Sequence, residues 1–331
     1  LITNIQVSKI IIENSSAIGV EIKNKNKLEK IFIEKEVLLS AGAINSPQIL
    51  MLSGVGPEEE LKNHGINVIS ALNGVGENLQ DHLETYVQYE CTKPVTLYSS
   101  FNPINMALIG MQWFLFKKGI AAHSNLEIGG FIRTNEMVDY PNMQYHFFPS
   151  LVIDHGRQNP SCHAFQAHVG PMRPTSRGFV KLKSSNPIDS PRIQFNYMQT
   201  EHDLNEMREG IKIARNIFHQ KAFDHYRGKE ISPGENINSD DGLNNFIRSK
   251  GDTAYHPSCT CKMGNDDMSV VDQNLKVYGV EKLRVVDASI MPNIVSGNLN
   301  ATTVMIAEKA SDLIQNKITA EKVNIEFYKA S

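Results

Sequence analysis

The stretch EVLLSAGAINSPQILMLSGVG, residues 36–56, changes from strand-like to helix-like across a run of small residues. An apolar strand is predicted at Val37 to Leu39. A helix is predicted to begin around Ser46-Pro47, because proline is tolerated in a first helical turn, and Gly54 and Gly56 are predicted to end it. Small residues between a strand and a helix let a ligand approach the backbone, so this unit is typical of an α/β fold.

The α/β texture is present at both ends of the chain. The opening stretches QVSKIIIE, AIGVEI and KIFIEKEVLL are rich in β-branched residues and are separated by turn-forming residues, which predicts a β-meander. Near the other end, KLRVVDASIMP predicts an apolar strand that ends in an acidic residue. The following stretch SGNLNATTVMIAEKASDLI predicts a loop and then a helix from about Thr302. Its apolar positions are Val304, Ala307, Ala310 and Ile314.

The middle of the chain has a different texture. Strand-like stretches such as MQYHFFPSLVI, HAFQAHVG and GFVKLKS alternate with loops rich in Pro, Ser and Asn. A helix then carries an apolar stripe at helical spacing, formed by Leu204, Met207, Ile211, Ala214 and Phe218. This pattern indicates an α+β domain built on an antiparallel sheet. We therefore predict an α/β domain from residues 1–84 and 246–318, an α+β domain from residues 85–245, and a tail of residues 319–331.

Composition excludes some classes of protein. The 331 residues carry a net charge of −3, with acidic and basic residues mixed throughout, which argues against a nucleic-acid partner. The most apolar segment, MALIGMQWFLFKKG at residues 106–119, is too short to span a bilayer. A core helix is the favoured interpretation of this segment, and an interfacial helix at a membrane surface is the alternative.

One histidine stands out in the stretch GDTAYHPSCTCKMG, residues 251–264. His256, Cys259 and Cys261 supply three metal ligands at most, whereas a structural zinc site needs four, so no metal site is predicted. The two cysteines are expected to be small buried residues, because a disulfide across one residue would be strained. His256 is either a buried structural residue or a group placed for proton transfer.

Several long segments together resemble the glucose–methanol–choline (GMC) oxidoreductases, which are flavin-dependent enzymes that oxidise alcohols. The segments are GAINSPQILMLSGVG (42–56), NGVGENLQDH (73–82), TAYHPSCTCKMG and the stretch from Leu283 to Ile314. The last two are most similar to choline-oxidising dehydrogenases of the family. The G-x-G-x-x-G turn with which the family opens is not in this sequence. The resemblance therefore implies the C-terminal portion of a flavoenzyme, with an incomplete α/β FAD-binding domain and an α+β substrate domain.

The resemblance also implies roles for individual residues. His256 corresponds to the catalytic base or alkoxide partner, and Asn298 to the second catalytic residue, whose amide hydrogen-bonds the substrate oxygen. A helix-entry role for Asn298 is the alternative. The cofactor is expected to be FAD, which accepts a hydride at its N5 atom. The residues that the resemblance implies for FAD binding are Val7, Asp287, Ala288, Asn300 and Thr302.

The expected substrate is a primary alcohol, with choline oxidised to betaine aldehyde. A trimethylammonium group needs aromatic faces and a carboxylate, for which Tyr255 and Glu127 are the candidates. Tyr145, Phe147, His163 and His168 are further wall residues or ordinary core. The expected electron acceptor is a quinone, and the expected location is cytoplasmic, with peripheral contact at the inner membrane. Two alternatives stay open: another alcohol as the substrate, or a truncated fragment without activity.

Overall fold

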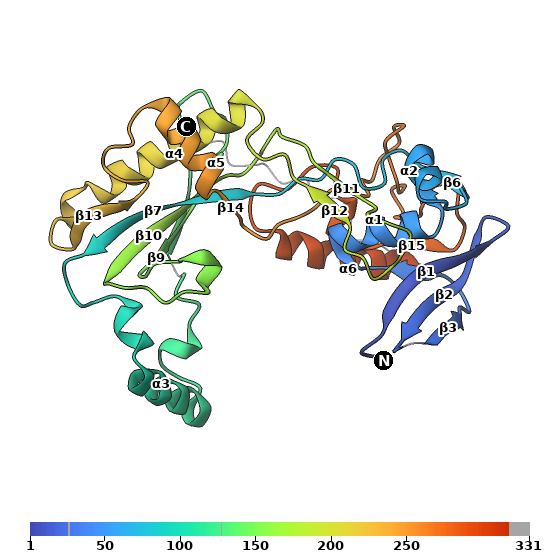
Figure 1. The fold of residues 1–331 in the computed structure, drawn as a ribbon, viewed down its shortest axis with the longest axis horizontal. Coiled ribbons are helices and arrows are strands. Elements are labelled where there is room, and N and C mark those ends of the chain that lie inside the picture. Colours follow the sequence, from blue (N-terminus) through green and yellow to red (C-terminus); the bar gives the residue numbers. More distant parts are fainter. Residues whose placement is uncertain (26, 127, 318–331) are drawn as a thin grey trace. The chain divides into compact units, whose positions relative to one another are not determined.

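The computed structural model describes residues 1–25, 27–126 and 128–317, and these residues form two compact units (Figure 1). Unit 1 contains residues 1–81, residues 176–197 and the described residues from Tyr255 onward. Unit 2 contains residues 82–175 and 198–254. The domain limits predicted at residues 84, 245 and 318 stay a prediction, and the tail at residues 319–331 lies outside the described residues.

Unit 1 contains most of the short strands. Its elements are β1 (Gln6–Glu13), β2 (Ser16–Asn24), β3 (Lys27–Phe32), β4 (Val37–Leu39), α1 (Gly42–Leu52), β5 (Val55–Gly56), α2 (Glu58–Asn63), β6 (Ser70–Ala71), β11 (Phe179–Lys181), β12 (Arg192–Gln194), β15 (Leu283–Val285), the 3₁₀ turn η5 (Ala288–Ile290) and α6 (Leu299–Ile314). Strands β1, β2 and β3 form an antiparallel sheet, as the meander pattern predicted. Strand β4 leaves that meander and pairs in parallel with β15.

The β4–β15 pair joins the two α/β segments that lie far apart in the sequence. Leu283, Arg284 and Val285 pair with Val37, Leu38 and Leu39. The buried residues of both strands belong to one hydrophobic core that also includes residues of α1, α6 and the cysteine segment. The middle residues Leu38 and Arg284 point to the other face, where Leu38 is 48% exposed, so the pair packs on this core through one face.

Residues 176–197 belong to unit 1, although the sequence showed no boundary inside 85–245. Backbone hydrogen bonds account for this placement. The Gly178 N–H donates to the Leu79 carbonyl at 2.9 Å, and the Val180 N–H donates to the Gly76 carbonyl at 2.6 Å. Strand pairing across a long sequence separation leaves no mark in the local sequence pattern, so this excursion could not be predicted.

Helix α1 begins at Gly42, earlier than the predicted start at Ser46-Pro47. The carboxylate of Asp287 stabilises the earlier turn, because its Oδ2 accepts hydrogen bonds from the Gly42 N–H at 2.9 Å and the Ser46 hydroxyl at 2.6 Å. Pro47 has no N–H to donate to the Ala43 carbonyl within the helix. The Thr260 hydroxyl donates to that carbonyl instead, at 2.6 Å. Proline is thus tolerated inside α1 because tertiary contacts replace the helical ones.

Unit 2 is built on an antiparallel sheet, as predicted. Its elements are β7 (Leu83–Cys91), the 3₁₀ turn η1 (Leu97–Phe101), α3 (Pro103–Phe116), the 3₁₀ turn η2 (Ile120–Ala122), β8 (Ile128–Ile132), β9 (Met143–Phe148), β10 (Ala164–Pro171), α4 (Glu201–Phe218), β13 (Arg227–Ser232), α5 (Asp240–Lys250) and β14 (Asp252–Thr253). The main sheet has the order β13-β7-β10-β9-β8, and β14 also pairs with β7. Helix α4 lies across one face of this sheet (Figure 1).

The apolar stripe predicted for α4 is confirmed. Leu204, Met207, Ile211, Ala214 and Phe218 are all buried. The ring of Phe218 lies between 5.1 and 5.3 Å, centroid to centroid, from the rings of Phe165, Phe223 and Tyr89. The unit therefore has an aromatic core between α4 and the sheet.

The core-helix interpretation of residues 106–119 is wrong. These residues lie mostly in α3, which buries none of its side chains. Within the described residues, α3 mainly contacts the flanking turns η1 and η2. None of the helices in the described part of the chain combines the length and hydrophobicity needed to cross a bilayer.

Candidate active site

The cysteine segment is held in place by backbone hydrogen bonds to two other parts of unit 1. The N–H groups of Cys259, Cys261 and Met263 donate to the carbonyls of Ala288, Ser289 and Ile290, at 3.2, 2.9 and 2.7 Å. On the other side, Ser258 and Gln80 exchange backbone hydrogen bonds of 3.0 and 3.2 Å. The turn that carries Tyr255 and His256 therefore begins from a fixed ladder.

His256 lies close to Asn298, the other residue for which a catalytic role was predicted. The Nε2 atom of His256 and the Nδ2 atom of Asn298 are 3.5 Å apart, and the imidazole is half-buried. Tyr255, the preceding residue, has a φ of 61° and is 70% exposed. A left-handed conformation is uncommon for a residue with a bulky side chain and is found mainly where surrounding contacts enforce it. The structure thus brings both predicted catalytic residues together, next to an unusual backbone turn.

Asp81 supplies such a contact, which the sequence did not predict. Its Oδ1 accepts a hydrogen bond of 2.8 Å from the backbone N–H of His256, and its Oδ2 accepts one from the Tyr197 hydroxyl. Asp81 is only 3% exposed. A buried carboxylate bound to a backbone N–H and a hydroxyl fixes the position of both donors. Asp81 lies in the run NLQD (78–81), and the structure shows that its three polar residues are half-buried or buried.

Gln80 extends the same support toward the segment before α6. Its Oε1 accepts from the Ile294 N–H at 3.2 Å, and its Nε2 donates to the Asn78 side chain at 3.0 Å. The Nδ2 of Asn78 in turn donates to the Pro292 carbonyl at 3.0 Å. The stretch 78–81 therefore connects the His256 turn to the chain that leads to Asn298.

Helix α6 begins at Leu299, earlier than the predicted start near Thr302. Asn298 occupies the N-cap position, but its side chain makes no capping hydrogen bond. Asn300 is exposed in the first turn, and Thr302 is half-buried. Of the apolar residues named for this helix, Val304 is 52% exposed and Ala307 is exposed, whereas Ala310 is buried. The remaining buried residues of α6 are Leu299 and Ile306.

Asp287 and Ala288 lie directly after β15, at the carboxyl end of the parallel strand pair. Ligands of open α/β sheets bind outside the carboxyl ends of the strands, so the position suits a cofactor. The Asp287 carboxylate is itself occupied by protein donors: Oδ2 by the α1 contacts described above, and Oδ1 by the Ser289 N–H at 2.8 Å. The turn η5, which begins at Ala288, contacts both α1 and α6. The N-terminus of α1 and the end of β15 therefore meet at Asp287, and the adjacent turn η5 contacts α6.

The other predicted residues are placed as follows. Val7 is half-buried on β1, in the meander sheet rather than in the β4–β15 pair. Glu127 lies outside the described residues. In unit 2, the Tyr145 hydroxyl donates to the Gly210 carbonyl at 2.9 Å, and Phe147 joins the aromatic core. His168 Nδ1 lies 2.9 Å from Glu84 Oε1, and His163 Nδ1 lies 2.8 Å from the Thr96 hydroxyl.

Cys259 and Cys261 are fully buried, as predicted. Burial raises the pKa of the Cys259 thiol to about 11 and raises that of Cys261 above its ordinary value as well. Both thiols are therefore protonated at neutral pH, the form that is least nucleophilic. Among the residues with described positions, no group of three His, Cys, Asp or Glu side chains is close enough to hold a metal ion.

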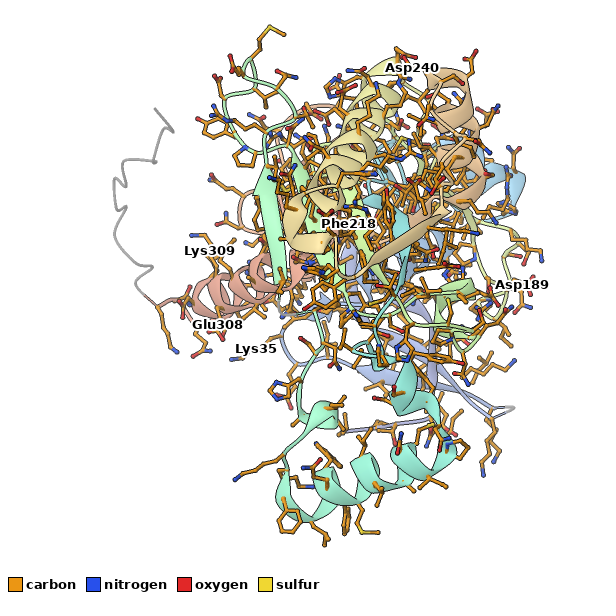
Figure 2. The ribbon with its side chains drawn as sticks, turned by 90° about the vertical axis from the view of Figure 1, so that its left-hand side faces the viewer. Lys35, Asp189, Phe218, Asp240, Glu308 and Lys309 are labelled. Atoms are coloured by element: carbon orange, nitrogen blue, oxygen red, sulfur yellow. The ribbon has the colours of Figure 1, made fainter. Side chains whose placement is uncertain are left out.

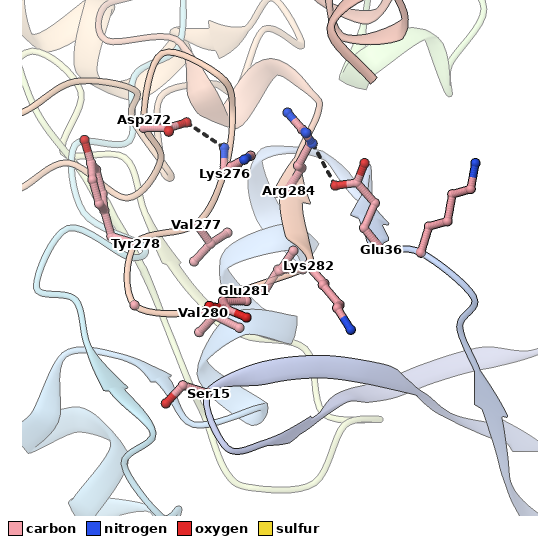
Figure 3. A pocket seen from close by; sticks show the side chains of 13 residues that line it. Ser15, Glu36, Asp272, Lys276, Val277, Tyr278, Val280, Glu281, Lys282 and Arg284 are labelled. Carbon is pink, nitrogen blue, oxygen red and sulfur yellow. Dashed lines mark hydrogen bonds and ion pairs between the residues drawn. The ribbon is translucent and has the colours of Figure 1, made fainter. Parts of the chain in front are cut away.

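A charged hollow of about 710 Å³ lies elsewhere in unit 1 and is a poorer candidate (Figure 3). Its lining includes Glu36 and Arg284, whose Oε2 and Nε atoms form an ion pair of 2.7 Å. Lys35, Glu36 and Lys282 precede strands β4 and β15, so the hollow lies at the amino ends of these strands. Asp287 lies at the opposite, carboxyl end of the strands, and α/β sheets bind their ligands at that end.

Comparison with known proteins finds relatives over almost the whole chain. The family models described as GMC oxidoreductase match residues 1–84 (the N-terminal model) and residues 174–307 (the C-terminal model). The chain is 51% identical over 325 residues to the mitochondrial choline dehydrogenase of Mus musculus, covering 98% of this chain and 54% of that protein. It is 50% identical over 334 residues to the oxygen-dependent choline dehydrogenase of Acinetobacter baumannii strain AYE, covering 100% of this chain and 60% of that protein.

Solved structures give the same result for the fold. The formate oxidase of Aspergillus oryzae RIB40 superposes with a TM-score of 0.87 at 25% identity, covering 94% of this chain and 60% of that chain. An FAD-dependent oxidoreductase from Chaetomium thermophilum superposes with a TM-score of 0.83 at 26% identity, covering 95% and 61%. The chain spans little more than half the length of the curated relatives it matches. On sequence and on fold, this chain belongs to the GMC oxidoreductase family.

Proposed function

We propose that this chain carries the catalytic histidine of an FAD-dependent alcohol dehydrogenase whose substrate is choline. The observation that carries the proposal is the pairing of His256 with Asn298, whose Nε2 and Nδ2 atoms are 3.5 Å apart. Identity of 50–51% to relatives named choline dehydrogenases supports choline as the alcohol. The product is betaine aldehyde.

The two side chains suit different parts of the reaction. The imidazole of His256 accepts the hydroxyl proton of the alcohol or hydrogen-bonds the alkoxide. The Asn298 amide does not titrate, so it holds the same oxygen in either protonation state. Tyr255, which is exposed beside His256, offers an aromatic face to the trimethylammonium group, and Glu127 is proposed as its counter-charge.

The segment from Asp287 to the first turn of α6 offers groups that suit an FAD cofactor. The first turn of α6 directs its N–H groups and the positive end of its dipole toward Asn298, with no side-chain capping bond at that position. We assign Asn300 and Thr302 to the flavin ring and Asp287 and Ala288 to the ribityl and phosphate part, with Val7 beside the adenine. When bound, FAD would supply the acceptor for the hydride that leaves the alcohol carbon.

Asp81 is proposed as a positioning residue for His256. It does not reach the substrate; it holds the backbone N–H of His256, at 2.8 Å, and so fixes the turn from which the imidazole projects. Misplacing a catalytic group by about 1 Å is enough to lower a rate roughly a hundredfold. The bond to Tyr197 keeps the carboxylate itself in place.

The FAD-loaded protein tests the proposal when it is mixed with choline in the absence of oxygen. Bleaching of the flavin absorption is expected to saturate with choline and to be lost in His256→Ala. The neutral analogue 3,3-dimethylbutanol, in which carbon replaces the nitrogen, is expected to react poorly with the wild type. Glu127→Gln is expected to weaken the binding of choline and to leave the reaction with the neutral analogue unchanged. If choline leaves the flavin unbleached while another alcohol bleaches it, choline is the wrong substrate.

Asp81 is tested in the same assay with two variants. Asp81→Ala removes the acceptor for the His256 N–H and is expected to slow flavin bleaching about tenfold to a hundredfold at saturating choline. Asp81→Asn keeps a carbonyl oxygen at that position and is expected to recover most of the rate. Flavin content and thermal stability serve as controls. Equal bleaching rates in Asp81→Ala and the wild type would remove Asp81 from the mechanism.

We further propose a quinone as electron acceptor and a cytoplasmic location with peripheral contact at the inner membrane. The exposed apolar helix α3 supports a membrane contact. The Acinetobacter relatives are named oxygen-dependent, so oxygen is the competing acceptor. Reoxidation of the choline-reduced protein by a short-chain ubiquinone, compared with oxygen and with hydrogen peroxide formation, decides between the two acceptors.

A further inference from the structure

Helix α3 exposes apolar side chains over most of its circumference, apart from a stripe formed by Asn105, the half-buried Ile109 and Gln112. Trp113, Phe114, Leu115 and Phe116 are consecutive and therefore cover a full turn, and they are 42%, 71%, 60% and 66% exposed. Ile104, Met106, Leu108 and Met111 are exposed to a similar degree. Figure 2 shows side chains projecting from the α3 ribbon on opposite sides. A helix that is apolar over most of its surface is normally covered by other protein or by a membrane.

The shape of this surface limits what can cover it. A groove on a partner protein takes one face of a helix, with contacts spaced three and four residues apart. Such a groove would leave the opposite face of α3 in water. The headgroup and acyl layers at the surface of a bilayer can cover more of the helix circumference than a groove does. The 14 residues of α3 are about 21 Å long, whereas the hydrocarbon core is about 30 Å thick, so α3 is suited to lie in the membrane surface and not to cross it.

The charged residues in the sequence segment that contains α3 are of one sign. Between Glu90 and Glu127 the sequence has no Asp or Glu, whereas Lys93, Lys117 and Lys118 are present. The Lys117 Nζ lies 4.0 Å from the centre of the Trp113 ring. Tryptophan and lysine together at the end of an apolar segment are typical of the boundary between acyl chains and headgroups. Lysines at this boundary attract anionic phospholipids.

We propose that α3 is a membrane-docking helix that inserts into the surface of a bilayer containing anionic phospholipids, with Lys117 and Lys118 in the headgroup layer. This inference rests on the peripheral contact included in the proposed function, and it identifies the element that makes the contact. It needs neither choline nor flavin reduction. Binding to lipid and oxidation of alcohol can therefore fail separately.

Co-sedimentation of the full-length protein with phosphatidylcholine vesicles, with and without phosphatidylglycerol, tests the proposal. The wild type is expected to bind the anionic vesicles. Phe114→Glu/Leu115→Glu is expected to bind them about tenfold or more weakly, because charged side chains are excluded from the acyl region. Lys117→Ala/Lys118→Ala is expected to lower the affinity for anionic vesicles roughly 30-fold and to change the affinity for neutral vesicles little. The control is Ile188→Glu, an exposed apolar residue of unit 1, which is expected to bind like the wild type.

The fluorescence of Trp113 provides a second measurement, because it is the one tryptophan among the 331 residues. Its emission is expected to shift to shorter wavelength with anionic vesicles and to be quenched by lipids brominated in the acyl chain. Trp113→Phe supplies the background signal. Absence of quenching, or equal vesicle binding by Phe114→Glu/Leu115→Glu, would overturn the proposal. A wild-type dimer that the same double substitution turns into a monomer, without lipid binding, would assign α3 to a second copy instead.

Discussion

Helices α3 and α4 belong to the same unit, yet the more apolar helix is the one that buries nothing. Helix α3 contains only two polar side chains, Asn105 and Gln112, and none of its residues is buried. Helix α4 is largely polar and charged, but eight of its residues are buried against the sheet and α5. Burial on folding follows the spacing of apolar residues, because a sheet offers one face to one stripe of a helix. Total hydrophobicity does not predict it.

This contrast indicates that the two helices have different roles. The stripe of α4 fills the core of unit 2 and stabilises its fold, whereas the apolar surface of α3 is available for an external contact. Substitutions at matched positions test this assignment.

The largest difference is expected between two phenylalanines. Phe218→Ala removes a ring that is 2% exposed and is expected to lower the free energy of unfolding by about 3–5 kcal/mol, since it leaves a cavity among Tyr89, Phe165 and Phe223. Phe114→Ala, at a site 71% exposed, is expected to change it by no more than about 0.5 kcal/mol. Urea denaturation followed by circular dichroism measures both. A comparable loss in Phe114→Ala would mean that α3 is packed in solution.

Substituting alanine for glycine is expected to change the stability with opposite sign in the two helices. A Cβ at Gly210 in α4 would lie 2.8 Å from atoms of Met143 and Val169, so Gly210→Ala is expected to destabilise by about 1–3 kcal/mol. A Cβ at Gly110 in α3 would meet no atom within 4 Å. Gly110→Ala is therefore expected to stabilise by about 0.5–1 kcal/mol, through helix propensity alone. Thermal unfolding of both variants beside the wild type is the measurement. Stabilisation by Gly210→Ala would contradict the close packing of α4.

Alkaline pH is expected to lower the free energy of unfolding by less than the substitutions in α4 do. Burial raises the pKa of Tyr145, whose hydroxyl donates to Gly210 of α4, above its ordinary value near 10. The unfolded chain then releases this proton at a lower pH than the folded chain, so stability is full below pH 10 and falls as pH rises above it. Between pH 10 and 11 the loss is about 1 kcal/mol for this group.

Tyr145→Phe serves as the comparison for the pH experiment. This variant is expected to be less stable at neutral pH, because it lacks the hydrogen bond to Gly210, and to lose less stability between pH 10 and 11. The measurement is the urea midpoint at each pH. Parallel curves for the variant and the wild type would show that Tyr145 titrates normally in the folded protein.

Much of the fold could be predicted from local pattern. The strands of the opening meander, the antiparallel sheet of unit 2 and the stripe of α4 all follow from periodicity, which a sheet or a helix imposes on its own sequence. The starts of α1 and α6 were predicted too late. In α1 the reason is tertiary: Asp287 binds the first turn, and Thr260 takes over the carbonyl that Pro47 leaves without a donor.

The candidate site divides in the same way. His256 and Asn298 were identified from sequence motifs, and the structure brings them within 3.5 Å of each other. Asp81 was not identified, because its contact to the His256 backbone joins residues 175 positions apart. The roles of all these residues in catalysis stay predictions until the flavin experiments are done.

By itself, the sequence determined the family, the alternation of apolar residues in each strand and the residue types available for proton transfer and cation binding. Only the tertiary structure decided which apolar residues are buried. It also decided which carboxylate holds the His256 turn and that α3 remains uncovered in the described chain. The physical reason is that periodicity and propensity act between neighbours, whereas burial and long-range hydrogen bonds depend on which segments the fold places side by side.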